Sequence, residues 1–402
     1  MLQLRTLLSV TVAWLALAGA AQADAVIDWN QRATGIIADA RIGTPPANRM
    51  AALVQTAVLD SVLAVTGNGT ASATDNMRIA VQAAVASANR TTLLRLVPSQ
   101  ATTIESAYAS ALATLPDGPP KASGIQAGDQ AALAVLARRA DDRVGTPESY
   151  RPHTTAGAYV PTAAVAVPQW PGRQPWIMSA PSQFRPAPPP ALDSATWQRD
   201  YSETKSLGGR ASALRTAEQT EIGQFWDYSL PPIYYGVVRS VAQLPGRDVV
   251  RNARLYAAIA QGMDDAMIAV LDAKYHYNFW RPVTAIRNGD LDGNAGTDRD
   301  PGWVSLIEAP LHPEYPSAHS ILAATVGTIL QAEIGRQPVQ LSTSSPTAKG
   351  ATRRWSTIED FIQEVGVSRV YGGIHFRFSN ETGIAMGRKL GAYVLEHRAA
   401  KP

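Results

Sequence analysis

Cysteine is absent from this chain of 402 residues. Its stability therefore cannot rest on disulfide bonds, and thiol chemistry is excluded. Net charge is also small, because 36 Lys and Arg against 33 Asp and Glu give +3, which excludes a strongly basic nucleic-acid binder. Charged residues make up only 17% and hydrophobic residues 46%, so a disordered chain is excluded too. At this length we expect two sub-cores, or one core with large excursions.

Residues 1–23 have the order of a secretory signal peptide. Arg5 precedes an apolar run over residues 7–18, and Ala21-Gln22-Ala23 forms a small-x-small site before Asp24. The alternative is an N-terminal membrane anchor, but the apolar run is short for ~30 Å of hydrocarbon. We therefore expect cleavage after Ala23, which lowers the net charge from +3 to +2. The mature protein should be periplasmic or secreted, with no later segment of the apolar length that a membrane requires.

Apolar residues recur at spacings of three and four along most of the chain, which predicts an all-α fold. We expect the chain to break at Thr44-Pro45-Pro46 and helical texture to resume at Ser194. Helices are predicted over residues 49–64, 76–88, 103–113, 127–142, 218–228 and 248–280.

Eleven of the 28 prolines lie between Pro147 and Pro190. This density excludes a regular helix and predicts a long wrapping connection or a lid-like excursion. Its Trp170, Trp176 and Phe184 indicate that it packs onto the protein. The expected organisation is a signal peptide (1–23), an N-terminal helical region (24–146), the proline-rich connection (147–193) and a C-terminal helical region that carries the functional site (194–402).

The first segment whose side chains could form a functional site is KYHYNFWRP, from Lys274 to Pro282. Lys274 and Arg281 are seven residues apart, or two helical turns, which predicts that both cations project from one helix face. Two such charges repel unless an anion or water lies between them. The alternative interpretation is an ordinary solvated basic face.

The second segment is HPEYPSAHS, at residues 312–320, followed by an apolar run. Pro316 and Ser317 predict a helix start. Its free N–H groups, the helix dipole and the Ser317 hydroxyl would form a cradle for an oxyanion. His319 lies in the first turn, where it could act on whatever the cradle holds. Taken alone, it could equally be a structural histidine.

The third segment is SRVYGGIH, at residues 368–375. The pattern Ser356-x-x-Glu359 predicts a capping box and a helix that ends near Arg369. Gly372-Gly373 should then turn the chain and return His375 close to Arg369. The alternative, a helix C-cap followed by a surface histidine, does not explain why three such segments occur in this order.

Together the segments supply three cations, an oxyanion-binding helix start and two histidines. This set suits phosphate or vanadate, because cations and backbone N–H groups can neutralise the oxygens. One imidazole could attack or ligate the central atom while the other exchanges protons.

The order Lys-x6-Arg-Pro, Pro-Ser-x-His and Ser-Arg-x5-His resembles the signature of the vanadium haloperoxidase and type 2 phosphatidic-acid-phosphatase superfamily. Residues 28–30, 49–60, 181–190 and 274–287 are similar to its bacterial haloperoxidase-like branch. The resemblance implies a mostly helical fold, with a pair of four-helix bundles at its core and vanadate as cofactor.

The resemblance also assigns roles. It implies that His375 ligates vanadium axially and that His319 is the acid–base catalyst. Lys274 would also be catalytic, by polarising bound peroxide. The oxyanion would be held by Lys274, Arg281, Ser317, Arg369 and the backbone N–H of Ala318. The signature commonly has glycine where this chain has Ala318, but only the backbone is needed there.

Two further residues are candidates for a halide pocket. His312 lies seven residues before His319, and a histidine there resembles the bromide-oxidising members. The alternative is a turn histidine beside Pro313. Trp280, next to Arg281, is the second candidate. His276 should point away from the site, and the two remaining histidines carry no signal.

Residues 290–298 contain the spacing Asp290, Asp292, Asn294, which is typical of a calcium loop. Glycine is missing at the sixth position and Pro301 replaces the closing glutamate, which favours a plain polar loop. The sequence shows no cluster of histidines and carboxylates of the kind that would predict a zinc or iron site.

The predicted function is a secreted, vanadate-dependent haloperoxidase that oxidises a halide, bromide rather than chloride, with hydrogen peroxide and an organic acceptor. One alternative is a soluble acid phosphatase that hydrolyses phosphate esters through a phosphohistidine at His375. Another is a non-catalytic oxyanion-binding protein, which the presence of both His319 and His375 disfavours. The expected partners are small molecules, without nucleic acid or membrane, and an oligomer is compatible with the sequence.

Overall fold

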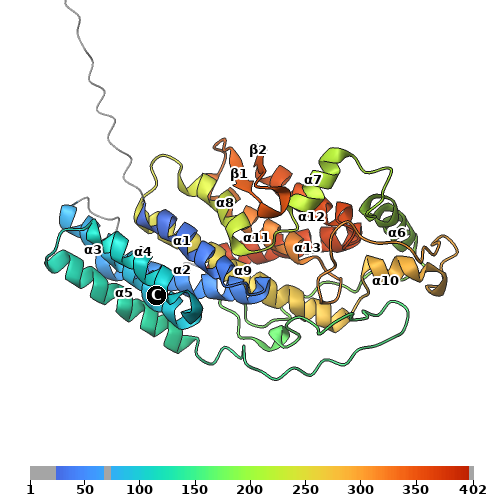
Figure 1. Cartoon of the computed structure of the whole chain (residues 1–402), viewed down its shortest axis with the longest axis horizontal. Helices are drawn as coiled ribbons and strands as arrows, with labels where there is room; N and C mark the ends of the chain where they lie inside the picture. The colour runs from blue at the N-terminus through green and yellow to red at the C-terminus, as the bar shows by residue number, and fades with distance from the viewer. Residues whose placement is uncertain (1–23, 68–73, 398–402) are drawn as a thin grey trace, which may run out of the picture.

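The computed structural model describes residues 24–67 and 74–397, so the predicted signal peptide lies outside the described residues. Thirteen α-helices and one two-stranded hairpin make up this part of the chain (Figure 1), which confirms the all-α fold class. The α-helices are α1 (Ala25–Asp39), α2 (Thr44–Thr66), α3 (Asp75–Leu96), α4 (Ala101–Ala113), α5 (Pro119–Arg138), α6 (Ala195–Gly208), α7 (Ala217–Phe225), α8 (Pro231–Ala242), α9 (Val249–Tyr277), α10 (Pro282–Arg287), α11 (Ala318–Ile334), α12 (Ile358–Tyr371) and α13 (Arg377–His397).

Short elements connect the helices. One-turn 3-10 helices occur as η1 (Pro98–Gln100), η2 (Trp170–Gly172), η3 (Gly289–Leu291) and η4 (Pro346–Ala348). The hairpin pairs β1 (Leu341–Ser344) antiparallel with β2 (Thr352–Trp355), with Leu341 opposite Trp355. The sequence pattern did not predict this hairpin, because strands of four residues offer too short a period to detect.

Several helices start earlier than their apolar pattern indicates, and proline is the reason. Pro45 and Pro46 lie in the first turn of α2, and Pro119 begins α5. A first-turn N–H has no acceptor within its helix, so proline removes nothing there, and its fixed φ suits the helix. The prediction that Thr44-Pro45-Pro46 breaks the chain before the helix is therefore wrong.

Helix α9 ends three residues before the predicted Trp280. Asn278 adopts a left-handed conformation with φ 49°, and its N–H donates to the carbonyl of Lys274 at 2.8 Å. Arg281 then stands outside α9, as the N-cap residue of α10. The prediction that Lys274 and Arg281 share one helix face is wrong, although the turn still brings them to the same site.

Helix α9 packs against both halves of the molecule. It contacts α2 of the N-terminal region and α11 of the C-terminal region, and in Figure 1 it extends between them. One large cluster of buried apolar side chains draws on α1–α3, α8, α9 and α11–α13. A smaller aromatic cluster surrounds Trp197 and Trp280. The core thus consists of one large apolar cluster and a smaller aromatic cluster. Helix α9 positions Lys274 where the two clusters meet.

Helix α2 is long and apolar enough to cross a membrane by length and composition alone, with a mean hydropathy of 1.3 over its best window. The prediction that no segment after residue 23 reaches this apolar length is therefore wrong. Of that window, 56% is buried inside the protein, because α2 packs against α3, α5 and α9.

We call residues 147–193 the strap. Its one regular element is η2, so the predicted absence of a helix is confirmed for these residues. Trp170 is fully buried, and Trp176 and Phe184 pack against the core, which confirms that the strap packs onto the protein. In Figure 1 the corresponding green segment runs along one side of the molecule before it reaches α6.

Carboxylates of α9 hold the strap in place. Asp265 is fully buried and accepts hydrogen bonds from the backbone N–H groups of Trp176, Ile177 and Met178 at 2.7, 2.8 and 2.9 Å. Two bidentate ion pairs lie on the same helix: Asp264 with Arg173, and Asp272 with Arg185.

Replacing Asp265 with asparagine should loosen the strap. The new amide would place a donor against backbone N–H donors, and a buried donor without an acceptor costs ~1–3 kcal/mol. We expect a loss of this size in the free energy of unfolding, measured with urea, and faster proteolysis within residues 147–193. Asp290→Asn, at an exposed carboxylate, is the matched control. Wild-type unfolding and proteolysis of Asp265→Asn would contradict this role.

Candidate functional site

The three segments singled out in the sequence meet in the structure. Lys274 is fully buried, and its Nζ donates to the carbonyls of Pro313 at 2.9 Å and Glu314 at 2.7 Å. Arg281 donates from Nε to the carbonyl of His312 and from Nη1 to that of Ile374, both at 2.9 Å. The first segment therefore contacts both of the others.

The second segment starts a helix as predicted. Ser317 is the N-cap of α11, and its Oγ accepts from the N–H of Ser320 at 3.4 Å and from the Ser320 hydroxyl at 3.0 Å. The N–H groups of Ala318 and His319 belong to the first turn, so α11 itself supplies no acceptor for them. They remain available to an oxyanion, where the positive end of the helix dipole adds to their effect.

The third segment lies at the end of α12, whose start differs by one residue from the prediction. Thr357, not Ser356, is the N-cap, and its Oγ1 accepts from the N–H of Asp360 at 3.0 Å. Thr357 and Asp360 have the same i, i+3 spacing as Ser356 and Glu359, so the pattern fits either pair. The helix ends at Tyr371, two residues beyond Arg369.

The glycine turn after α12 requires glycine at its second position. Gly373 has φ +74°, and a Cβ there would lie 2.2 Å from the carbonyl oxygen of Gly208. The turn brings the N–H of Ile374 back to the carbonyl of Arg369 at 3.2 Å. It thus places His375 next to the end of α12, as the sequence predicts.

The hydrogen bonds of His375 define its protonation. Its Nδ1 lies 2.8 Å from Glu314 Oε1, and its Nε2 lies 3.3 Å from Arg281 Nη1. An arginine can only donate, so Nε2 accepts and Nδ1 carries the proton. Burial, with the cations Arg281 and Lys274 as further causes, holds the pKa of His375 well below its usual range. The ring is therefore neutral at neutral pH.

His319 is 8% exposed, and its Nε2 has no hydrogen-bond partner among the described residues. The ring is hydrogen-bonded to the backbone of Trp226. Since Nε2 is unpartnered, Nδ1 makes this bond and Nε2 is the basic nitrogen. Burial, together with Arg369 and Lys274, holds the pKa of His319 well below its usual range.

The three cations are all buried. Burial lowers the pKa of Arg281 and of Arg369 to about 10, and burial together with Arg281 lowers the pKa of Lys274 well below its usual value. Two carboxylates oppose these shifts: Glu314 faces Lys274 and Arg281, and Asp227 faces Arg369. Burial raises the pKa of Glu314 to about 7, although both cations lower it. Cations therefore outnumber carboxylates, which favours binding of an anion.

Part of the chain matches a known protein family. Residues 254–401 match the family model described as the VCPO second helical-bundle domain. The vanadium chloroperoxidase of Curvularia inaequalis is 28% identical over 174 residues, an alignment that covers 35% of this chain. The chain spans only 28% of the length of that relative.

Two solved structures resemble the whole fold. A bacterial vanadium-dependent iodoperoxidase superposes with a TM-score of 0.74 at 23% identity, over 93% of this chain and 95% of that one. A holo-type bacterial vanadium-dependent chloroperoxidase superposes with a TM-score of 0.71 at 20% identity, over 89% and 93%. Residues 254–401 thus resemble one domain of the vanadium chloroperoxidases, and the whole fold resembles that of bacterial vanadium haloperoxidases. The resemblance predicted from the three segments is confirmed.

The site has donors suited to vanadate. Arg369 donates from Nη1 to the carbonyl of Trp226, but its buried Nε has no partner among the described residues. The buried His319 Nε2 is likewise without a partner within that part of the chain. Unpaired buried polar atoms beside surplus positive charge fit an oxyanion, and His375 Nε2 offers the lone pair that a metal ligand needs.

The two halide-pocket candidates both lie beside Arg281. His312 Nδ1 lies 3.0 Å from Arg281 Nη2 and 3.1 Å from the carbonyl of Pro313. Trp280 is buried in the aromatic cluster and stacks on Trp197 with ring centroids 5.8 Å apart. His276 is exposed on α9, as predicted.

Sequence reasoning missed three groups at this site: the carboxyl of Glu314, the carbonyl of Trp226 and the carboxyl of Asp227. Glu314 stands between two prolines inside a segment already chosen for its chemistry, but nothing in that segment signals its burial or its partner His375. The other two lie about 90 residues before His319 and carried no signal either.

The loop at residues 290–298 uses its carboxylate internally. Asp292 accepts from Trp197 Nε1 at 2.7 Å and from the N–H of Asn294 and the hydroxyl of Thr297, both at 2.8 Å. These bonds tie the loop to α6 and to itself, as expected of a plain polar loop.

A pocket of about 600 Å³ opens beside the site, and Asp227, Leu306 and Glu308 are among its lining residues. Asp227 follows Trp226, whose carbonyl receives hydrogen bonds from Arg369 and His319. Asp227 therefore belongs both to the lining of this pocket and to the chain segment that contacts Arg369 and His319.

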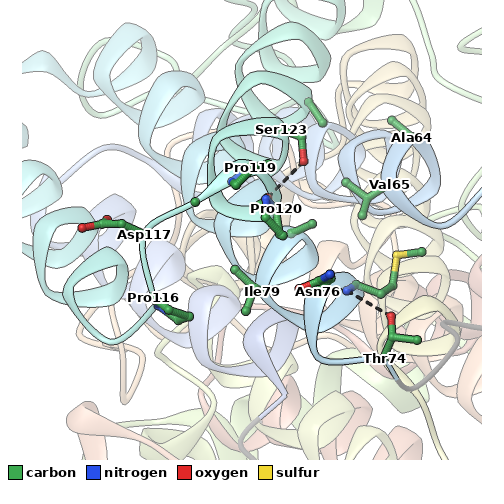
Figure 2. Close-up of a pocket in the computed structure, with 14 residues that line it drawn as sticks. Ala64, Val65, Thr74, Asn76, Ile79, Pro116, Asp117, Pro119, Pro120 and Ser123 are labelled. Atoms are coloured by element: carbon green, nitrogen blue, oxygen red, sulfur yellow. Dashed lines mark hydrogen bonds between the residues drawn. The ribbon is translucent and has the colours of Figure 1, made fainter.

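A second pocket, of about 920 Å³, lies apart in the N-terminal bundle. Figure 2 shows its lining from the end of α2, the start of α3 and the loop before α5. Among the described residues of this lining, Asp117 is the one titratable group, and it pairs with Lys121 at 2.9 Å. A single paired carboxylate cannot supply acid–base chemistry, so this pocket is not a catalytic candidate.

Proposed function

We propose that this protein is a vanadate-dependent haloperoxidase that oxidises a halide with hydrogen peroxide. The observation that carries the proposal is the buried cradle in which three cations and the N-terminus of α11 face a neutral His375. Support also comes from the relatives, which include fungal and bacterial vanadium chloroperoxidases and a bacterial iodoperoxidase. When bound, vanadate would supply the Lewis acidity that activates peroxide.

The protein's own residues would hold and orient the anion and would move the proton of the substrate. Lys274, Arg281 and Arg369 would bind the oxygens of the anion, with the N–H of Ala318 and the helix start at Ser317 completing the cradle. His375 Nε2 would ligate the metal. His319 Nε2 would accept and return the proton of the substrate, because no other described group occupies it. Burial of these groups excludes bulk water, which strengthens each interaction.

Bromide is the proposed halide, with His312 and Trp280 beside Arg281 as the halide pocket. We further propose that the signal peptide is removed after Ala23 and that the protein acts in the periplasm or outside the cell. N-terminal sequencing of the mature protein from culture medium and periplasm tests this point. A protein that retains residue 1 and stays in the cytoplasm would contradict it.

The deciding experiment measures two activities on the same preparation. Apo protein, with and without added vanadate, is assayed with peroxide and chloride, bromide or iodide for halogenation of a diketone acceptor. A phosphate monoester is assayed in parallel. We expect vanadate-dependent halogenation, faster with bromide than with chloride. Ester hydrolysis without halogenation at any vanadate concentration would overturn the proposal.

That second outcome would identify an acid phosphatase, which one observation favours. His375 presents an unprotonated Nε2 next to Arg281, so it could attack phosphorus as well as ligate vanadium. His319 would then protonate the leaving group.

If one cradle serves both anions, phosphate should inhibit halogenation by displacing vanadate. Arg369→Ala should weaken both anions together, because a hydrogen bond to a charged group contributes ~1.5–3 kcal/mol, or roughly tenfold to a hundredfold in affinity. Isothermal titration with each anion measures this. Arg388→Ala, at a half-exposed arginine paired with Glu359, should leave both affinities unchanged. Simultaneous binding of phosphate and vanadate would show two separate sites.

A further inference from the structure

Glu314 has an unusual position for a carboxylate. It is fully buried in the loop before α11. Its Oε1 accepts from His375 Nδ1 at 2.8 Å and from the N–H of Phe376 at 3.0 Å. One oxygen atom therefore binds the imidazole ring and the backbone of the next residue, which fixes both the ring and the chain that carries it.

The backbone of Glu314 joins the other segments. Its carbonyl accepts from Lys274 Nζ at 2.7 Å, and its N–H donates to the carbonyl of Phe279 at 2.9 Å. The same residue thus contacts the segment after α9, the cation Lys274 and the turn after α12. Glu314 therefore fixes the positions of these three segments relative to one another.

The consequence for His375 is chemical. A neutral imidazole carries its proton on either nitrogen, and the partner of one nitrogen decides which. With a carboxylate on Nδ1, the proton stays there and the lone pair of Nε2 faces Arg281 and the cradle. Carboxylates that bind the second nitrogen of a metal-ligating histidine orient the ring and raise its basicity.

We propose that Glu314 is a positioning residue that holds His375 in the Nδ1–H tautomer and aims its Nε2 at the bound oxyanion. The assignment rests on the proposed role of His375 as ligand or nucleophile. It extends the site by a residue that never touches the anion and acts only through the histidine.

The test reads the tautomer directly, in protein without vanadate. With only six histidines in the chain, long-range proton–nitrogen correlation of protein labelled with nitrogen-15 in histidine can resolve the ring of His375. The spectra are taken at pH 8, and His375→Ala assigns the signal. Wild type should show a protonated Nδ1 and an unprotonated Nε2.

Two variants of Glu314 should change the His375 tautomer and the vanadate affinity to different extents. Glu314→Met removes the acceptor, and we expect both tautomers and a tenfold to hundredfold loss of vanadate affinity in equilibrium dialysis, roughly the loss typical for such partners. Glu314→Gln keeps an oxygen but loses the charge and offers a donor as well. It should show a smaller fraction of the second tautomer and an intermediate loss. The control is Glu333→Gln, at a glutamate of α11 that pairs with Arg247. It should match wild type in both measurements.

The outcomes separate the possibilities. A folded Glu314→Met, or failing that Glu314→Gln, with the wild-type tautomer overturns the proposal, even if vanadate affinity falls, because the role would then be electrostatic alone. Wild-type affinity with a changed tautomer also overturns it. A changed tautomer with reduced affinity supports it. Absence of halogenation by the wild-type protein would instead contradict the proposed function and leave these measurements intact.

Discussion

His375→Ala should abolish vanadate retention, halogenation and any phosphate ester hydrolysis. In either mechanism this imidazole makes the one covalent or coordinate bond from the protein to the central atom. The cations would still attract an oxyanion, but they cannot replace that bond. We expect activity to fall to background and vanadate to be lost on gel filtration, as measured by metal analysis of the eluted protein.

The fold should survive this change, because His375 lies in the turn between α12 and α13 rather than inside a helix. Its removal leaves Glu314 without the imidazole, so a modest loss of stability is expected, and circular dichroism should confirm native helix content. His276→Ala, at an exposed position of α9, is the matched control and should retain vanadate. Normal vanadate retention by His375→Ala would show that another group ligates the metal.

His319→Ala should separate turnover from binding. Loss of a positioned acid–base group typically costs ~10²–10⁴ in rate. The cations and His375 remain, so vanadate affinity should change little. Steady-state halogenation and equilibrium dialysis on the same protein measure the two quantities. His153→Ala, in the strap, is the control. Equal loss of affinity and rate would place His319 among the anion-binding groups instead.

The pH profile gives a further readout for His319. Burial and the neighbouring cations lower its pKa, so the imidazole is a free base at neutral pH and becomes protonated only well below its usual range. A bound anion raises this pKa, because its negative charge stabilises the imidazolium. If the base form is required, wild-type activity falls as pH drops through that pKa. In His319→Ala this acidic limb should disappear from the profile.

Most of the fold and the meeting of the three candidate segments could be predicted from the sequence because both depend on local signals. Helical spacing, the helix start at Ser317 and the turn at Gly372-Gly373 are each encoded within a few residues. Helix ends were less predictable. Nothing in the apolar pattern shows that Asn278 turns left-handed, so the argument that placed Lys274 and Arg281 on one helix face was wrong although both residues reach the site.

Glu314 shows why the rest of the site was not predictable. A glutamate in a loop is normally solvated, and its sequence neighbours give no reason to bury it. Its partner His375 lies 61 residues further along the chain. Tertiary packing, including that of α13 against α11, brings the two together. The same holds for the carbonyl of Trp226, since a backbone acceptor has no signature in the sequence.

Because the site contains more buried cations than carboxylates, a bound anion should stabilise the native state. The cradle exists only in the native state, because its charges come from segments spread over about 100 residues of the unfolded chain. An anion that binds only the native state stabilises it by about 2.7 kcal/mol at a hundredfold excess over its Kd. Vanadate or phosphate in the medium should therefore raise the yield of refolding and the thermal midpoint. The supply of anion during folding would then influence how much protein reaches the native state, before any turnover occurs.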